Sequence, residues 1–239
     1  MVGGKVAGMS RPVRALRWRG SVIAGLAVGF TLVCASAGAA NPGTEVAGPP
    51  CCGPISPAAQ SLTRFLDDSG VERLWLAHQH VNWESGEPDR PPDYAGTGRA
   101  THCSAYAAAM GKRLGIYMLR PPAHSAILLA SAQTLWFSSA EGTRQGWEEL
   151  AGADAAQSRA NAGALVVISY ASPNPGKPGH IAIVRPSLKT QQQLQDEGPQ
   201  IAQAGALNSA NDTARHGFAR HTGAWPDGVR YFAHLVPGR

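Results

Sequence analysis

The stretch "GALVVISYASPNPGKPGHIAIVRP" (163–186) decides the predicted fold. Its two apolar runs, "ALVVISY" and "HIAIVRP", are rich in β-branched residues, and the "ASPNPGKPG" between them is dense in turn-forming residues. We therefore expect an antiparallel hairpin whose second strand begins at His180. Ala182 and Val184 would share a face with His180, which places a polar ring at the mouth of an apolar strand. A histidine at a loop edge facing solvent is the alternative interpretation.

A single cysteine lies upstream, at the start of an expected helix in "GRATHCSAYAAAMGKRLG" (98–115). Five residues of this stretch would lie on one face of a helix, namely Cys103, Tyr106, Ala107, Met110 and Leu114. Thr101 is the expected N-cap, and Gly115 marks the helix end. A thiol in the first turn lies near unpaired backbone amides, which favour the thiolate and can form an oxyanion hole. The alternative is a small buried apolar side chain.

The first forty residues have the pattern of a secretory signal peptide. Five basic residues and no acidic ones precede the apolar run 21–34, and "ASAGAA" (35–40) provides small residues for cleavage after Ala39 or Ala40. The apolar run of about 14 residues is shorter than the roughly 20 that span a bilayer. We therefore expect a secreted or periplasmic protein with no integral membrane segment after cleavage. A lipoprotein anchored through Cys34 is a weaker alternative.

Removal of this leader changes the charge balance. The chain has 21 Lys and Arg against 16 Asp and Glu, and the five leader bases account for the difference. A near-neutral mature protein does not favour a nucleic-acid partner. Residues 41–57, rich in proline and glycine, are expected to form a tether, and residues 58–239 a single domain.

Three cysteines remain after cleavage, which leaves at least one thiol unpaired within the chain. Cys51 and Cys52 lie in the expected tether, so Cys103 is the candidate for a free thiol. A disulfide from Cys103 to either of the other two is the alternative. The paired histidines of "HQH" (78–80) and "RHGFARH" (215–221) lack companion ligands at a zinc spacing, so no metal or cofactor is expected.

The order of these features resembles the NlpC/P60 and CHAP group of papain-like cysteine peptidases and amidases, which cut peptidoglycan peptides. The resemblance covers roughly residues 80–210 and is carried by the helix-start cysteine, "AQSRANAGALVVIS" and "GHIAIV". It implies an α+β fold in which the nucleophile helix packs on an antiparallel sheet. It also implies that Cys103 is the nucleophile and His180 the base. The group's usual "D-C-S" is "H-C-S" here, so His102 is a candidate substrate contact.

A third polar group is expected to orient the imidazole of His180. We expect Asn208 to do so, since it gives the order Cys, His, Asn of papain-like enzymes. Gln203 is the alternative, because it would share a face with Ile201 on a strand beside that of His180. A turn-forming role is the other interpretation of Asn208. Trp83 is a weak candidate for the substrate cleft, with core packing as its alternative.

The remaining pattern predicts helices near 124–139 and 146–161, and strands near 164–171, 180–186, 199–205 and 229–236. Helices that precede strands predict a two-layer α+β arrangement. The expected function is an exported cysteine hydrolase that cleaves amide bonds of peptidoglycan, either in the stem peptide or between muramoyl and alanine. The alternatives are an inactive wall-binding or partner-binding module of the same fold, and an exported acyltransferase or protein peptidase.

Overall fold

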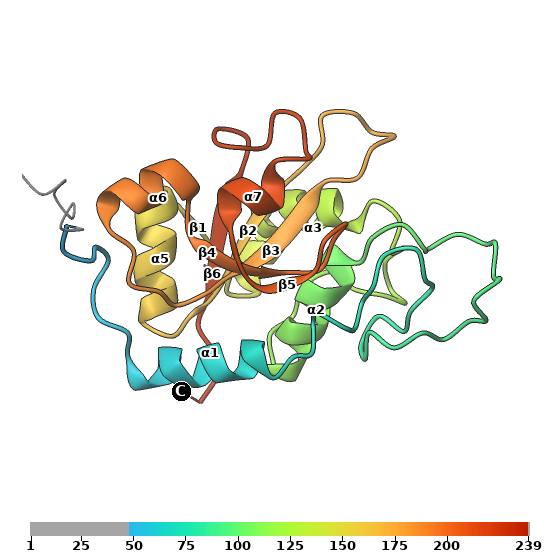
Figure 1. Ribbon diagram of the computed structural model, residues 1–239, viewed down its shortest axis with the longest axis horizontal. Coiled ribbons are helices and arrows are strands. Elements are labelled where there is room, and N and C mark those ends of the chain that lie inside the picture. The colour runs from blue at the N-terminus through green and yellow to red at the C-terminus, as the bar shows by residue number, and fades with distance from the viewer. Residues whose placement is uncertain (1–47, 239) are drawn as a thin grey trace, which may run out of the picture. The chain divides into compact units, whose positions relative to one another are not determined.

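The computed structural model describes residues 48–238, which form a mixed α+β structure built on one antiparallel sheet (Figure 1). The expected leader lies outside the described residues, as does the first part of the expected tether. The helices are α1 (Pro57–Asp67), α2 (Cys103–Arg113), α3 (Leu129–Phe137), α4 (Ala140–Arg144), α5 (Ala153–Asn161), α6 (Gln191–Glu197) and α7 (Ala214–Phe218). The strands are β1 (Glu148–Leu150), β2 (Leu165–Tyr170), β3 (His180–Val184), β4 (Gln200–Gln203), β5 (Ser209–Thr213) and β6 (Arg230–His234).

The predicted hairpin is confirmed and forms the centre of the sheet. The strand order is β1-β6-β2-β3-β4-β5, and β2 pairs with β3 from Tyr170 opposite His180 to Val166 opposite Val184. Every residue of both strands is buried, because helices cover both faces of the sheet. Nearly continuous apolar runs are what such doubly covered strands require.

The two faces have separate apolar cores. On one face, α1, α2 and α3 pack on side chains that include Val167, Ile181 and Ile183. On the other face, α5 and α7 pack on Val166, Ala182 and Val184. Figure 1 shows α1 below the sheet and α2 at its lower right, with α5 and α6 at its left and α7 above it. The expected two-layer arrangement is therefore wrong, because α5, between β1 and β2, and α7, between β5 and β6, cover the second face.

The helix that carries the cysteine is confirmed, but its expected cap is not. α2 begins at Cys103, and His102 occupies the N-cap position without a side-chain hydrogen bond to the helix, so Thr101 is not the cap. All residues from Cys103 to Gly111 are buried. Four of them are alanines, whose small side chains allow the helix to approach the sheet closely.

The two other predicted helices are shorter than expected. Leu128 has a left-handed backbone with φ of 59°, so α3 begins only at Leu129. The predicted helix 146–161 is wrong in its first part, where Glu148–Leu150 pairs with β6 as strand β1. Tertiary pairing with the last strand overrides the local helical pattern there.

The part of the expected tether that the structure describes is bound to the domain. The Cys51 amide donates to the Lys189 carbonyl at 2.8 Å, and the Ser56 amide donates to the Asn161 carbonyl at 2.9 Å. The Asn161 side chain also donates to the Gly53 carbonyl at 3.1 Å. Residues 51–56 are thus bonded to the loop after β3 and to the C-terminal end of α5 before α1 begins.

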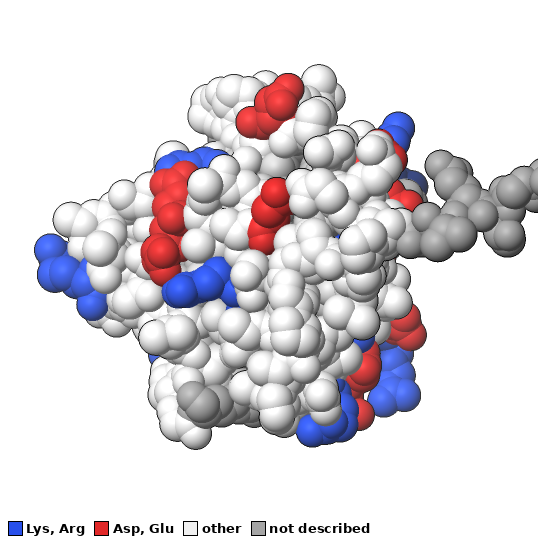
Figure 2. Space-filling view, turned by 90° about the vertical axis from the view of Figure 1, so that its left-hand side faces the viewer, with Lys and Arg blue, Asp and Glu red and all other residues white. Residues whose placement is uncertain are grey.

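The surface seen from the side of α5 and α6 carries both signs of charge. Figure 2 shows acidic and basic side chains interspersed on this face, without a continuous basic surface on it. Within residues 48–238, none of the helices is long and apolar enough to cross a membrane.

Candidate active site

Cys103 is a buried free thiol at the N-terminus of α2. Its side chain is 4% exposed and forms no disulfide, because Cys51 and Cys52 are bonded to each other. The alternative disulfide between Cys103 and either of them is therefore not formed. Cys103 also lines a cavity, so its thiol is not enclosed by the apolar core on every side.

Burial dominates the acidity of this thiol. Desolvation raises the pKa of Cys103, while the backbone amides of Ile181, Ser104 and Cys103 itself partly offset the shift. The backbone amides at the helix start favour the thiolate, as expected, but burial has the larger effect on the pKa of Cys103. The amide of Ile181 also places the sulfur next to the beginning of β3, one residue after His180.

His180, the first residue of β3, is buried on the α7 side of the sheet. Its ring packs edge-on against Phe218 with centroids 4.8 Å apart, and it stacks on His221 at 4.7 Å. Burial and the neighbouring His221 lower the pKa of His180 to about 4, against the opposing effect of its hydrogen bond to Gln203. The imidazole is therefore neutral near pH 7, the form that a general base needs.

Gln203 orients this imidazole. Its Oε1 lies 2.7 Å from His180 Nε2, and its Nε2 donates to Asp212 Oδ2 at 2.9 Å. An ionised carboxylate can only accept hydrogen bonds, so Asp212 turns the amide nitrogen of Gln203 toward itself. The amide oxygen then faces His180, which donates through Nε2 and keeps Nδ1 as the unprotonated nitrogen.

The prediction that Asn208 orients His180 is wrong. Asn208 Oδ1 accepts from the Gly205 amide at 2.9 Å. Its Nδ2 donates to the carbonyls of Val71 at 2.8 Å and Leu74 at 2.7 Å. The hydrogen bonds of the Asn208 side-chain amide thus close the turn after β4 and join this turn to the loop that follows α1. Gln203, the alternative that the sequence offered, forms the hydrogen bond to His180 that was expected of Asn208.

The two expected substrate contacts differ in outcome. Trp83 packs partly buried against the core, and its ring lies 5.5 Å from Lys112 Nζ near the C-terminal end of α2. It does not line the cavity beside Cys103, so its expected place in the cleft is wrong. His102 does line this cavity, and its Nε2 lies 2.9 Å from the Gln79 carbonyl. Burial lowers the pKa of His102, and its contact with substrate stays a prediction.

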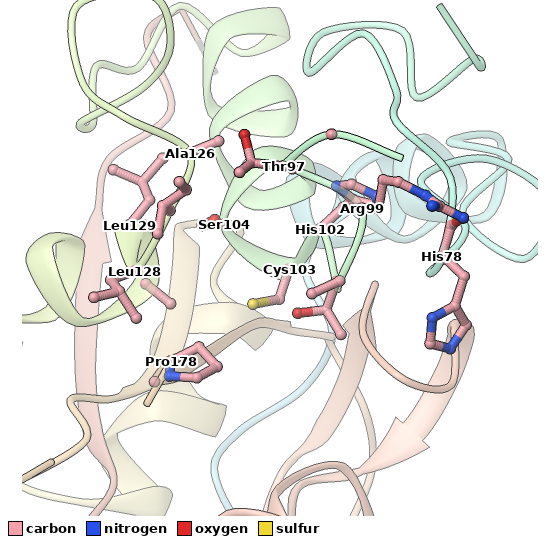
Figure 3. A pocket seen from close by; sticks show the side chains of 17 residues that line it. His78, Thr97, Arg99, His102, Cys103, Ser104, Ala126, Leu128, Leu129 and Pro178 are labelled. Carbon is pink, nitrogen blue, oxygen red and sulfur yellow. The ribbon is translucent and has the colours of Figure 1, made fainter. Parts of the chain in front are cut away.

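The cavity beside Cys103 has a volume of about 620 Å³. Figure 3 shows Cys103 between Leu128 and Pro178 on one side and Arg99 and His102 on the other. No sequence pattern marks Arg99, Leu128 or Pro178, because they lie in irregular segments without periodicity. Only proximity to Cys103 in the folded chain identifies them.

A second, smaller cavity of about 200 Å³ adjoins the first. His180, Gln203 and His221 line it, and it shares Thr101 and Pro178 with the cavity of Cys103. The recorded hydrogen bond of the His180 ring goes to Gln203, and none joins this ring to the thiol. The structure thus brings the predicted nucleophile and base into adjacent cavities at one end of β3.

The described residues hold no group of three or more His, Cys, Asp or Glu side chains arranged to bind a metal ion. His80 pairs with Asp89, His216 with Asp212, and His221 stacks on His180. No protein-family model matches the chain, and no curated protein was found to be similar to it.

Proposed function

We propose that this chain is an exported cysteine hydrolase of amide bonds, with Cys103 as nucleophile and His180 as general base. One observation carries the proposal. A free thiol at a helix N-terminus lines a cavity of about 620 Å³, and the strand beside it begins with a neutral imidazole whose tautomer is fixed by Gln203.

The proposed reaction is acyl transfer to the thiol and then to water. Cys103 Sγ attacks the amide carbonyl while Nδ1 of His180 takes the thiol proton. The amides of Cys103 and Ser104 at the start of α2 stabilise the oxyanion. The imidazolium then gives its proton to the leaving amine, and a water molecule, deprotonated by the same imidazole, releases the acyl group. Because the thiol pKa is raised and the His180 pKa is lowered, proton transfer accompanies the attack instead of preceding it.

Peptidoglycan is the proposed substrate. The order of Cys103, the "AQSRANAGALVVIS" segment and "GHIAIV" resembles NlpC/P60 and CHAP hydrolases, and an antiparallel sheet with the cysteine helix packed on it is compatible with that resemblance. The signal-peptide pattern of residues 1–40 supports export to the compartment that contains the cell wall.

A catalytically inactive binding module is the second candidate. Two observations favour this candidate. The Cys103 thiol contacts the backbone amides of Ile181 and Ser104, and it has no hydrogen bond to His180. In that case the cavity would hold a wall fragment or a partner without cleaving it.

Digestion of purified peptidoglycan by the mature protein tests the proposal, with products identified by mass spectrometry. We expect new amide-cleavage products that are lost in Cys103→Ala and after alkylation of Cys103 with iodoacetamide. Chelators should have no effect. The double variant Cys51→Ser/Cys52→Ser is the matched control, because it keeps Cys103 and should stay active and sensitive to alkylation. Full activity of Cys103→Ala would disprove the cysteine mechanism, and binding to peptidoglycan without products would favour the inactive module.

A further inference from the structure

The cavity beside Cys103 has two chemically different ends. Residues 126–130, which lead into α3, and Pro178 form an apolar wall. The other end is formed by the loop 96–102 together with His78. In Figure 3 Ala126, Leu128 and Leu129 lie on one side of Cys103, and Arg99, His102 and His78 lie on the opposite side.

The apolar wall is open to solvent. Ile127 is 57% exposed although it is a large apolar residue, and Leu128 beside it is partly exposed. Exposed apolar side chains that line a concave site mark a place for an apolar group of a ligand. A volume of about 620 Å³ leaves room for much more than a methyl group.

The opposite end holds a positioned cation. Arg99 Nε donates to the His78 carbonyl at 3.1 Å, and the His78 amide donates to the Arg99 carbonyl at 2.6 Å. The second bond holds the backbone of Arg99 beside that of His78, and the first holds its guanidinium at the cavity wall. Among the described residues no carboxylate forms an ion pair with Arg99, so its terminal nitrogens are available to an anionic ligand.

We infer that the site selects a peptide with a bulky apolar side chain on one side of the scissile amide and a carboxylate on the other. The apolar side chain lies against Ile127 and Leu128, and the carboxylate pairs with Arg99. Cys103 lies between the two ends, where the amide carbonyl must be attacked. This inference rests on the proposed cysteine mechanism, and it replaces peptidoglycan with a peptide of this kind as the preferred substrate of the same site.

A matched set of synthetic peptides tests both ends. The set compares leucine with alanine at each position next to the cleaved amide, and a C-terminal carboxylate with a carboxamide. A peptide with the sequence of a peptidoglycan stem is included. We expect leucine to raise kcat/KM by about tenfold to a hundredfold over alanine. The carboxylate should raise it about tenfold over the carboxamide.

Variants connect each preference to its residue. Arg99→Gln should remove the preference for the carboxylate, while Arg99→Lys should restore part of the preference. Ile127→Ser should remove the preference for leucine over alanine. Arg73→Gln and Leu135→Ser are the controls. Arg73 is an exposed arginine outside the cavity, and Leu135 is a 64% exposed leucine on α3 that does not line it.

Binding to Cys103→Ala, measured by titration calorimetry, separates failure of the inference from failure of the proposed function. The same two preferences in binding support the inference even if the wild-type protein cleaves nothing. Equal affinity for all peptides, or better turnover of the stem peptide than of the leucine peptides, overturns the inference while the cysteine mechanism stands. Preferences that persist in both Arg99→Gln and Ile127→Ser overturn it as well.

Discussion

The amide of Gln203 lies between the imidazole of His180 and the carboxylate of Asp212. Reversal of this amide would present its nitrogen to Nε2 of His180 and exchange the tautomer, so that Nδ1 could no longer take a proton. Asp212 prevents the reversal because its carboxylate accepts hydrogen bonds only. The side chains of Gln203 and Asp212 therefore determine which nitrogen of the proposed base is free.

Exchange of the two groups tests this arrangement. We expect Asp212→Asn and Gln203→Glu each to lower kcat, by roughly tenfold to a thousandfold, below the ~10⁴-fold loss when the carboxylate of a serine triad is replaced. The first allows the amide to reverse, and the second places two carboxylates together. The double variant Gln203→Glu/Asp212→Asn should recover most of kcat, since a carboxylate at position 203 accepts from both the imidazole and the new amide.

Kinetics on one peptide substrate, with folding checked by circular dichroism, measure the coupling between positions 203 and 212. The pH profile of kcat/KM should return to that of the wild type in the double variant. Strictly multiplicative losses in the double variant would show that the two side chains act independently.

Asn208 has a structural role, so its replacement should lower stability more than activity. Its side chain donates to the carbonyls of Val71 and Leu74, which lie far away in sequence. Asn208→Ala should lower the free energy of unfolding by about 1–3 kcal/mol, because these carbonyls lose their donor. Urea denaturation measures the change, and the exposed Asn211 of β5 provides the control Asn211→Ala, which should stay within about 0.5 kcal/mol of wild type. A large loss of kcat at unchanged stability would return the orienting role to Asn208.

At the scale of elements, α3 holds together the two ends of the central hairpin. Ser131 Oγ accepts from the Ser172 amide at 3.2 Å, just after β2, and from the Gly179 amide at 3.1 Å, just before β3. The same helix begins at the apolar wall of the Cys103 cavity. The approach of α3 to the hairpin therefore positions both His180 and that wall.

The end of β2 at Tyr170 and the start of α3 at Ser131 together leave no space for a side chain at Gly179. A Cβ there would overlap the Tyr170 carbonyl and lie 2.8 Å from Ser131 Oγ. Gly179→Ala should therefore push the start of β3 away from α3, reduce stability by about 1–3 kcal/mol and lower activity through the displaced His180. Gly176→Ala, in the same turn, meets its nearest atom at 3.4 Å and is the matched control. Thermal unfolding and kcat/KM measure both effects, and equal behaviour of the two variants would disprove the tight approach.

At the scale of the whole molecule, burial shields three histidine side chains from solvent, wholly or in part. Burial lowers the pKa of His180 to about 4 and also lowers the pKa values of His102 and His221. In the unfolded chain these groups titrate near pH 6.5. Between pH 6.5 and 4 the unfolded state therefore binds protons that the folded state excludes.

The free energy of unfolding should accordingly be largest above pH 6.5 and fall as the pH decreases toward 4. His180 alone accounts for a loss on the order of 3 kcal/mol across this range. Urea denaturation at a series of pH values measures the slope. The slope should be smaller in His180→Gln, whose side chain does not titrate. An identical slope in that variant would show that His180 is not the group responsible.

Local sequence patterns account for the parts of this protein that depend on neighbours along the chain. The β2–β3 hairpin and the start of α2 at Cys103 follow from local apolar periodicity and turn residues, because period and turn chemistry act over a few residues. The shared face of Ile201 and Gln203 also follows from strand alternation, so Gln203 could be named as a candidate beside His180.

Only the tertiary structure decided which candidates meet. Asn208 and Gln203 are five positions apart, yet one bonds the loop after α1 and the other bonds His180, since the turn after β4 carries Asn208 away from the sheet. The segment 148–150 became a strand because β6, some eighty residues later, pairs with it. Arg99 and Leu128 line one cavity because α3 packs beside the start of α2. Contacts of this kind depend on packing between distant segments, which no local pattern encodes.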